Sequence, residues 1–329
     1  MKFMKPLFLT VFFSAALATG VSTHAQEKVN LRFGTAGIGA ASYVYAAAMA
    51  EMVTPKLPPG SNIDVVPGTG SIGSLKLIQR GERELATTHS VPAAEACGGY
   101  GSFQGNKHDQ VRVVIGGLDT WYLTTFVTKK SGVTSWDEIV AAKNRFHLLI
   151  VPPGGAGYAA AMSVLAAMGS NPKDIQGKGG YIESVSRKGV PERVRDGKAD
   201  GWVHIVPRGH PTATQLVLIN DMRVLPLPEK VIEKMSKSGW KARSIPANTW
   251  KGQTEPVQTV ITGSGIIAKA TVPENAIYQF TKTIIENAKR LPKIHAALGE
   301  FDPKKAADSI DCPLHPGAAR YYREAGLIR

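Results

Sequence analysis

The sequence contains little cysteine, and its two cysteines lie far apart at Cys97 and Cys312. This spacing excludes the closely paired cysteines that are typical of zinc sites and dithiol redox centres. Two alternatives stay open. In an oxidising compartment the two residues would form a disulfide between early and late parts of the chain. Otherwise they are two separate buried thiols.

Motifs of the common enzyme and metal sites are also missing. There is no Gly-x-Ser-x-Gly elbow, no phosphate loop ending in Gly-Lys-Ser/Thr, and no His-Glu-x-x-His among the 8 histidines. His204 and His210 are six positions apart and would not share a helical face. The adjacent His89 and Ser90 are a weak catalytic signal, because no acid is placed to orient the histidine. We therefore expect a non-enzymatic protein with no metal site and no cofactor.

Basic residues outnumber acidic ones but form no long run. Lys and Arg total 39 against 26 Asp and Glu, for a formal charge of +13. No basic run is longer than a pair such as Lys129-Lys130 or Lys304-Lys305, and no nucleic-acid-binding motif is present. We therefore expect no nucleic-acid partner, and the charge modestly favours small anionic ligands.

Long apolar runs are absent except near the start of the chain. Residues 7–18 are apolar, follow Lys2 and Lys5, and precede small residues that end at Ala25. This arrangement is typical of a secretory signal peptide, and the run is too short to span a membrane. We expect residues 1–25 to be removed near Ala25 and the protein to reach the periplasm. No cysteine follows the cleavage site, so we expect no lipid anchor.

The chain repeats a rhythm of strand, glycine-rich turn and helix, which is typical of a parallel sheet with right-handed crossovers. The pattern predicts strands at 29–34, 63–66, 84–88, 147–151 and 199–206, and helices at 41–53, 72–80, 158–168 and 273–289. Two long extended stretches, 111–129 and 257–269, separate two sets of these units. They predict an α/β protein whose chain crosses twice between two lobes. We expect lobe 1 at 26–122, lobe 2 at 123–262, and a return to lobe 1 at 263–329.

Three glycine-rich turns precede predicted helices, at 34–39, 68–73 and 154–157. Taken singly, each turn more often only shapes a tight bend. Together they indicate an anion site, because helix N-termini favour negative charge and strand ends line the ligand crevice of open α/β sheets. The candidate ligand-binding residues are Thr35, Ser42, Tyr43, Thr69, Gly70, Ser71, His89, Ser90, Trp121, Gly155, Gly157, Tyr158 and Trp202. Core packing is the commoner fate of a tryptophan, and Arg208 is a weaker candidate for a carboxylate partner.

Several segments resemble one family of receptors. The C-terminal segment 314–327 (LHPGAARYYREAGL) is similar to the terminal motif of the TAXI-type receptors, the extracytoplasmic proteins associated with TRAP transporters. Further similar landmarks are Phe33–Ala36, Gly209–Thr212, Ile245–Ala247 and Trp250–Gln253. The resemblance runs from about Leu31 to Leu327, which is nearly all of the expected mature chain.

The resemblance implies a type II periplasmic-binding-protein fold with two α/β lobes joined by two hinge strands. It implies a periplasmic solute-binding receptor that delivers a small organic anion to the membrane subunits of a TRAP-type secondary transporter. Related receptors take amino acids such as glutamate and dicarboxylates such as 2-oxoglutarate. We expect a monomer that closes around its ligand, held by Tyr43 and Ser71 from one lobe and by 155–158 from the other. The alternative is a receptor for an ATP-driven importer or a sensor kinase.

The sequence departs from the family pattern in two places. Residues 86–90 read Ala-Thr-Thr-His-Ser where many relatives carry Gln-Ser-Asp, and Trp202 and His204 stand where relatives usually carry small or phenylalanine side chains. These bulky and imidazole groups are expected to reshape the pocket. The ligand therefore cannot be copied from relatives.

Overall fold

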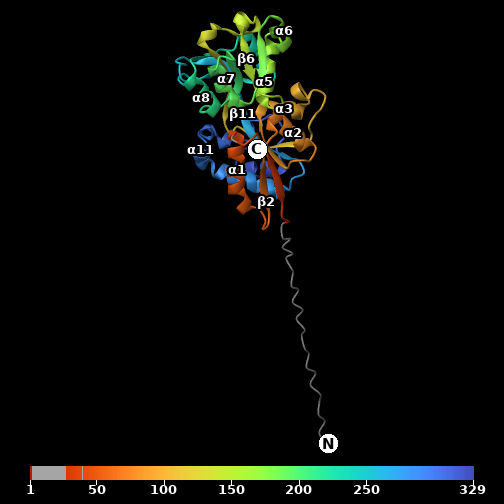
Figure 1. The fold of residues 1–329 in the computed structure, drawn as a ribbon. Helices are drawn as coiled ribbons and strands as arrows, with labels where there is room; N and C mark the ends of the chain where they lie inside the picture. Colours follow the sequence, from red (N-terminus) through yellow and green to blue (C-terminus); the bar gives the residue numbers. More distant parts are fainter. Residues whose placement is uncertain (2–26, 39) are drawn as a thin grey trace.

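The computed structural model describes residues 1, 27–38 and 40–329. The expected signal peptide and its cleavage near Ala25 fall almost entirely outside these residues. Among the described residues, no helix is both long and apolar enough to cross a bilayer. Figure 1 shows two lobes stacked one on the other, with the N-terminal and C-terminal segments together in the lower one.

The first lobe is built around a parallel core of three strands. In β1, Leu31 and Phe33 are buried while Asn30 and Arg32 are exposed, so this strand buries one face against helices. Strand β1 pairs in parallel with β2 and β3, and the last part of β11 joins β3 antiparallel. The strands of this lobe are β1 (Asn30–Gly34), β2 (Asn62–Val66), β3 (Leu85–His89), β4 (Val111–Ile115) and the end of β11 (Val257–Lys269).

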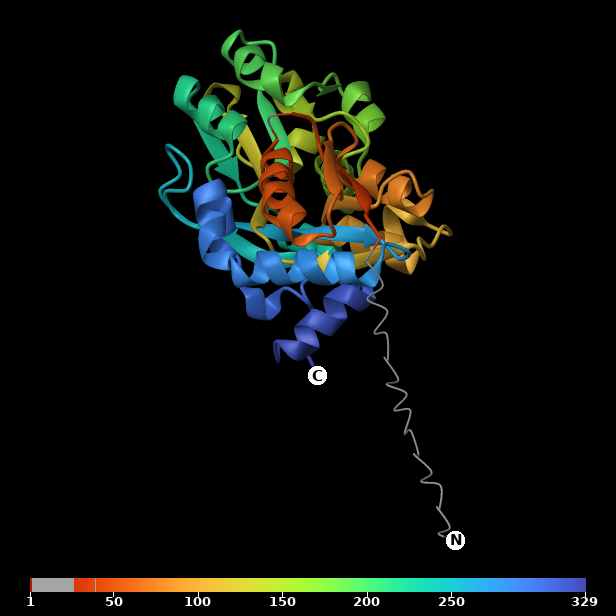
Figure 2. The same cartoon turned by 90° about the horizontal axis from the view of Figure 1, so that it is seen from below.

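Helices cover both faces of this sheet. They are α1 (Ala41–Val53), α2 (Gly70–Gln79), α3 (Ser90–Gly98), α10 (Glu274–Glu286), α11 (Leu291–Ile294) and α12 (Pro316–Glu324). One core packs α1, α10 and α12 on β1, and a second packs α2 and α3 on β3 and β4. Figure 2 shows the C-terminal helices, in blue, gathered along one side of this lobe. The end of the chain therefore completes the lobe in which it begins.

The second lobe has its own mixed sheet. Strands β6 and β8 are parallel, as are β6 and β7, whereas β5 runs antiparallel to both β8 and β9. Its strands are β5 (Thr120–Thr128), β6 (His147–Ile150), β7 (Tyr181–Ser184), β8 (Gly201–Val206), β9 (Met222–Leu225), β10 (Lys241–Ile245) and the start of β11. Its helices are α4 (Trp136–Val140), α5 (Ala156–Ala167), α6 (Pro172–Gly177), α7 (Val190–Arg195), α8 (Pro211–Ile219) and α9 (Glu229–Ser236). Strand β8 is buried along its whole length, because helices lie on both faces of this sheet.

Two segments carry the chain between the lobes. Strand β4 ends at Ile115 and β5 begins at Thr120, with Gly116 and Gly117 between them. Strand β11 pairs with β10 and β5 up to Gly263 and with β3 and β4 from Ser264 onward. The long apolar stretches at 111–129 and 257–269 are thus the two connections between the lobes, as their length suggested.

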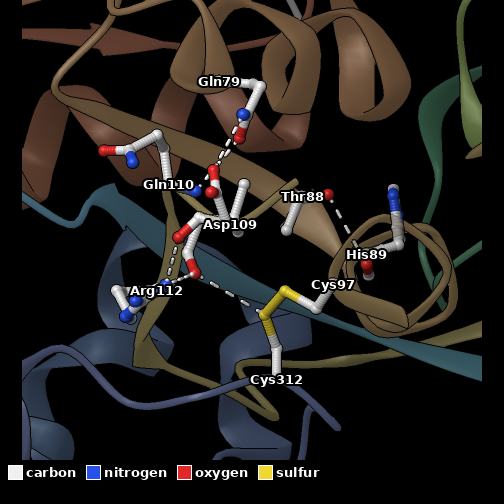
Figure 3. Close-up of a disulfide and its surroundings, with 9 residues drawn as sticks. Gln79, Thr88, His89, Cys97, Asp109, Gln110, Arg112 and Cys312 are labelled. Atoms are coloured by element: carbon white, nitrogen blue, oxygen red, sulfur yellow. Dashed lines mark hydrogen bonds between the residues drawn. A yellow bond between two sulfur atoms is a disulfide. The ribbon is translucent and has the colours of Figure 1, made fainter. Parts of the chain in front are cut away.

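The structure joins the two cysteines in a disulfide. Cys97 lies in the last turn of α3, and Cys312 lies in the segment before α12 (Figure 3). His89 stands at the other end of the same helix, as its N-cap residue. The disulfide therefore fastens α3 to the C-terminal part of the first lobe, and the alternative of two separate thiols is excluded.

Candidate functional site

A cavity of about 250 Å³ lies where the lobes meet. The first lobe contributes residues at the ends of β1 and β3 and at the starts of α1 and α2. The second lobe contributes the start of α5, the loop after β7, and strand β8. Because the carboxyl ends of parallel strands and the starts of the following helices share one edge of a sheet, both lobes present the same kind of surface to this space.

Four helices begin at or beside the cavity without a side-chain cap. They are α1, α2, α3 and α5, whose N-cap residues are Ala40, Thr69, His89 and Gly155. Elsewhere in the second lobe α4, α6 and α8 are capped by side chains, whereas α7 and α9 are not. An uncapped N-terminus leaves N–H groups and the positive end of the helix dipole for another partner. The starts of α1, α2 and α5 therefore favour an anion in this space, whereas at α3 the Val91 N–H already donates to the Thr262 hydroxyl and Pro92 has no N–H.

Arg187 is the one fully charged side chain among the described residues that line the cavity. It begins a short 3₁₀ turn, Arg187–Gly189, between β7 and α7. Half-buried, it has no ion-pair partner within the described part of the chain. Burial lowers the pKa of Arg187, but a guanidinium stays protonated at neutral pH. The cavity thus carries a positive charge that none of the described residues pairs with.

Three imidazoles surround this charge and are neutral. Burial, aided by the Arg187 cation, lowers the pKa of His89 and of His210 to about 4. Burial also lowers the pKa of His204 well below its usual 6.5. Nε2 of His89 and both ring nitrogens of His204 have no hydrogen-bond partner among the described residues. The site therefore combines one cation with neutral groups that still have hydrogen bonds to make.

Ser71 and His89 form a pair that resembles the serine and histidine of a catalytic triad. The Oγ of Ser71 lies 2.6 Å from Nδ1 of His89. A His89 pKa of about 4 makes this imidazole a weak base at neutral pH, and among the described residues no carboxylate orients its other nitrogen. The pair is therefore suited to hydrogen bonding with a ligand and poorly suited to activating Ser71.

Gly157 is required by the position of His204. A Cβ at Gly157 would lie 2.0 Å from Nδ1 of His204, whose side chain is buried with 3% exposure. We expect Gly157→Ala to lower the free energy of unfolding by about 1–3 kcal/mol, because the imidazole must shift within a packed wall. Urea unfolding measures this loss. Gly177→Ala is the control, because a Cβ at Gly177 meets nothing within 4 Å; equal stability of both variants would contradict the expected clash.

The buried histidines predict a pH-dependent stability of the ligand-free protein. The unfolded state binds protons near pH 6.5, whereas burial holds the pKa of His89, His210 and His315 at about 4 in the folded state. Because the unfolded state binds these protons more readily than the folded state, the free energy of unfolding is highest above pH 6.5 and falls as the pH drops toward 4. Between pH 7.5 and 5.5 we expect a loss of about 1 kcal/mol per histidine. Denaturant unfolding at these two values, where exposed carboxylates hardly titrate, tests this; equal stabilities would contradict it.

The structure brings about half of the sequence-predicted site residues into the cavity wall. Those that line it are Ser42, Gly70, Ser71, His89, Trp121, Gly155 and Gly157. Trp121 packs edge-on against the His89 ring, with centroids 4.7 Å apart. These residues come from α1, α2, β3, β5 and α5, so both lobes are represented.

The other predicted residues lie beside the cavity and do not line it. They are Thr35, Tyr43, Thr69, Ser90, Tyr158 and Trp202. The Thr69 hydroxyl is bonded to Ser74, and the Ser90 hydroxyl is bonded to Thr262. Trp202 is fully buried and stacks on Phe126 at 5.9 Å. The polar or aromatic groups of Thr69, Ser90 and Trp202 are thus already used within the protein.

Arg208 contacts the other lobe and does not line the cavity. Its guanidinium pairs with Glu300 at 2.5 Å, and both side chains are substantially exposed. Because Glu300 belongs to the first lobe, this pair links the lobes at the surface. An exposed pair of this kind contributes little to stability.

Sequence reasoning did not select Arg187 or His204 as ligand contacts. Arg187 follows β7, a strand that the periodicity did not predict because its residues are mostly partly exposed. His204 was noted only as a departure from the family pattern, and its neighbour Trp202 was selected instead. Trp202 and His204 are two positions apart and share one face of β8, with ring centroids 5.1 Å apart. They differ in their position along the strand, since His204 lies nearer its carboxyl end and lines the cavity. Strand periodicity alone could not have separated the two.

Comparisons with known proteins agree with this architecture. Residues 33–326 match the model of the NMT1-like family. Among solved structures, the periplasmic binding protein BugD is similar at 14% identity, covering 92% of this chain and 99% of that one, with a TM-score of 0.52. A protein from Bordetella bronchiseptica RB50 is 12% identical, with coverage of 91% and 98% and a TM-score of 0.52. XAC2383 from Xanthomonas citri, solved with ATP, is 14% identical, with coverage of 91% and 97% and a TM-score of 0.50.

At these identities the likeness shows the fold alone. The expected two-lobed α/β fold of type II periplasmic binding proteins is confirmed. Within the described residues, no group of three or more His, Cys, Asp or Glu is placed to hold a metal ion.

Proposed function

The chain belongs to the NMT1-like family, and on this premise we propose that it is a periplasmic solute-binding receptor of an import system, capturing a small organic anion between its lobes. One observation carries the proposal: Arg187 has no ion-pair partner among the described residues and lines a cavity at which the uncapped helices α1, α2 and α5 begin. An anion would satisfy the guanidinium and the helix N-termini together. The positive net charge of the chain would also steer anions toward the cavity.

The mechanism follows from the position of the site between two lobes. Ser42, Gly70 and Ser71 approach the ligand from the first lobe, and Gly155, Gly157 and Arg187 approach it from the second. A ligand that touches both lobes binds the closed arrangement better than an open one, and so shifts the population toward closure. The backbone N–H of Gly73 already donates to the carbonyl of Gly154 across the gap, at 3.4 Å. We propose the chain division 26–122, 123–262 and 263–329, with the connection before β5 and strand β11 as hinges.

We further propose that the membrane partner is of the TRAP type, driven by an ion gradient. The supporting observation is the resemblance of segment 314–327 and its companions to TAXI-type receptors. The resemblance also makes glutamate and 2-oxoglutarate the first ligands to try. An ATP-driven importer or a sensor kinase is the alternative partner.

Tryptophan fluorescence tests capture in the interlobe cavity. Trp121 lines the cavity, whereas Trp136 and Trp202 are buried in the second lobe. A bound anion is expected to change the emission of the wild-type protein, and Trp121→Phe is expected to lose most of that change. If ligands that raise the melting temperature alter emission equally in both proteins, binding occurs elsewhere and the proposal fails.

Uptake into vesicles distinguishes the partners. With TRAP membrane subunits and a bound ligand, uptake should require this receptor and stop when the ion gradient is collapsed. Uptake that persists without the gradient and requires ATP would favour the alternative importer.

A further inference from the structure

The described side chains that line the cavity carry a net positive charge. Arg187 supplies one positive charge, and no carboxylate lines the cavity among the described residues. Asp119 lies close by, but its oxygens are used: Oδ2 accepts from the Tyr45 hydroxyl at 2.8 Å, and Oδ1 accepts from the hydroxyl of Ser264 at 2.5 Å. Burial raises the pKa of Asp119, which further weakens it as a partner for a cation. An ammonium group in the cavity would therefore meet a cation and no anion.

The cavity also lacks a second cation. Among the residues that the structure describes, the remaining titratable groups that face it are His89, His204 and Tyr45. His210 lies behind His204, with ring centroids 6.2 Å apart. Burial lowers the pKa of His89 and His210 to about 4 and the pKa of His204 well below 6.5, so the three imidazoles are neutral at pH 7. A second carboxylate on a ligand would lose its hydration with no charged partner to replace it.

The neutral imidazoles indicate what the rest of the ligand carries. His204 is 3% exposed and both its ring nitrogens lack partners among the described residues. A neutral imidazole has one donor and one acceptor nitrogen, and a hydroxyl, amide or keto group can satisfy them. Leu118, Val151 and Ile205 make the adjoining wall apolar. A ligand that complements this surface has an apolar carbon skeleton and an uncharged polar group.

We propose that the cavity selects ligands with a single negative charge, such as a monocarboxylate or monosulfonate, whose other polar groups are uncharged. Amino acids and dicarboxylates are disfavoured, including the glutamate and 2-oxoglutarate that the resemblance alone suggests. The inference rests on the proposed receptor function and narrows its ligand class. It also gives a role to His89 and His204, at which the sequence departs from the pattern of the TAXI-type receptors. These two residues supply neutral groups that can hydrogen-bond to a ligand.

The test is a thermal-shift panel of three equal classes at pH 7.5, followed by calorimetry of every hit. The classes are monoanions with uncharged polar groups, dicarboxylates, and amino acids. Each contains members of matched triplets: 5-hydroxypentanoate, glutarate and 5-aminopentanoate, and 4-hydroxybenzoate, terephthalate and 4-(aminomethyl)benzoate. We expect the tightest ligands among the monoanions, with at least tenfold weaker binding of the matched dianion and amine.

The outcomes separate this inference from the receptor function. A dicarboxylate or an amino acid that binds more tightly than every monoanion overturns the inference and leaves the receptor standing. Absence of binding in all three classes counts against the receptor function, and the inference fails with it. Hits confined to the monoanions support both.

A charge-compensating variant provides a second arm. Ser42 lines the cavity near the start of α1, where an acidic side chain is favourable to the helix. Ser42→Asp places an internal carboxylate in the cavity and is expected to weaken monoanion binding at least tenfold relative to the isosteric Ser42→Asn. The ratio of amine to monoanion affinity should rise in Ser42→Asp alone. Equal ratios in the two variants would overturn the electrostatic basis of the selection.

Discussion

Replacing Arg187 by glutamine is expected to weaken binding of the captured anion at least 100-fold. Arg187 is the uncompensated cation of the cavity, and a charge-assisted pair in a partly dry site is stronger than a neutral hydrogen bond. A 100-fold loss corresponds to about 2.7 kcal/mol of binding free energy. Calorimetry of wild-type and variant proteins with the same ligand measures it.

The stability of the ligand-free variant separates a binding role from a structural one. Arg187 has no ion-pair partner in the described chain, so its removal takes away a half-buried charge and breaks no pair. We expect Arg187→Gln to melt at the same temperature as the wild type or higher, and to lose the ligand-induced rise. Lys188→Gln, which removes an exposed charge one residue along the chain, is the matched control. Comparable weakening in both variants would mean that general charge, and not the Arg187 contact, governs affinity.

Removing the Cys97–Cys312 disulfide is expected to lower the free energy of unfolding by about 2–5 kcal/mol. The two cysteines are separated by 215 positions, so the bond restricts a very large loop in the unfolded chain. It also ties α3 to the segment that precedes α12 (Figure 3). The double variant Cys97→Ala, Cys312→Ala, compared with the wild type in urea, measures the loss.

Chemical reduction gives the control for this prediction. A thiol reductant should shift the unfolding midpoint of the wild type toward that of the double variant, and leave the double variant unchanged. Ligand affinity well below the melting temperature should change less than threefold, because the disulfide and His89 lie at opposite ends of α3. If the oxidised wild type and the double variant unfolded at the same urea concentration, the stabilising role of the disulfide would be contradicted.

The periodic parts of the fold were predictable from the sequence. The helix at 41–53 and the strand at 257–269 have the bounds that the pattern predicted. Both have strong local signals: an alanine-rich segment that packs between layers, and a long β-branched stretch. Short edge elements were missed, among them β7, β9 and β10, because they are partly exposed and carry little alternation.

The site was predictable only where a local signal marked it. Glycine-rich turns before helices located Gly70, Ser71, Gly155 and Gly157, since the physical reason for glycine there is local. Arg187 had no such signal. Its importance comes from the absence of a carboxylate among the described residues that line the cavity, which is a property of the folded arrangement. Nothing in a single sequence shows which of many arginines is left unpaired.

The most direct test of the account is thermal unfolding of the chain from residue 26 onward against a panel of small organic anions. A ligand present at 100 times its dissociation constant should add about 2.7 kcal/mol of stability and raise the melting temperature. The account predicts at least one such ligand, with the rise lost in Arg187→Gln and retained in Lys188→Gln. A panel without any stabilising anion, or a rise that survives in Arg187→Gln, would contradict capture of an anion in the interlobe cavity.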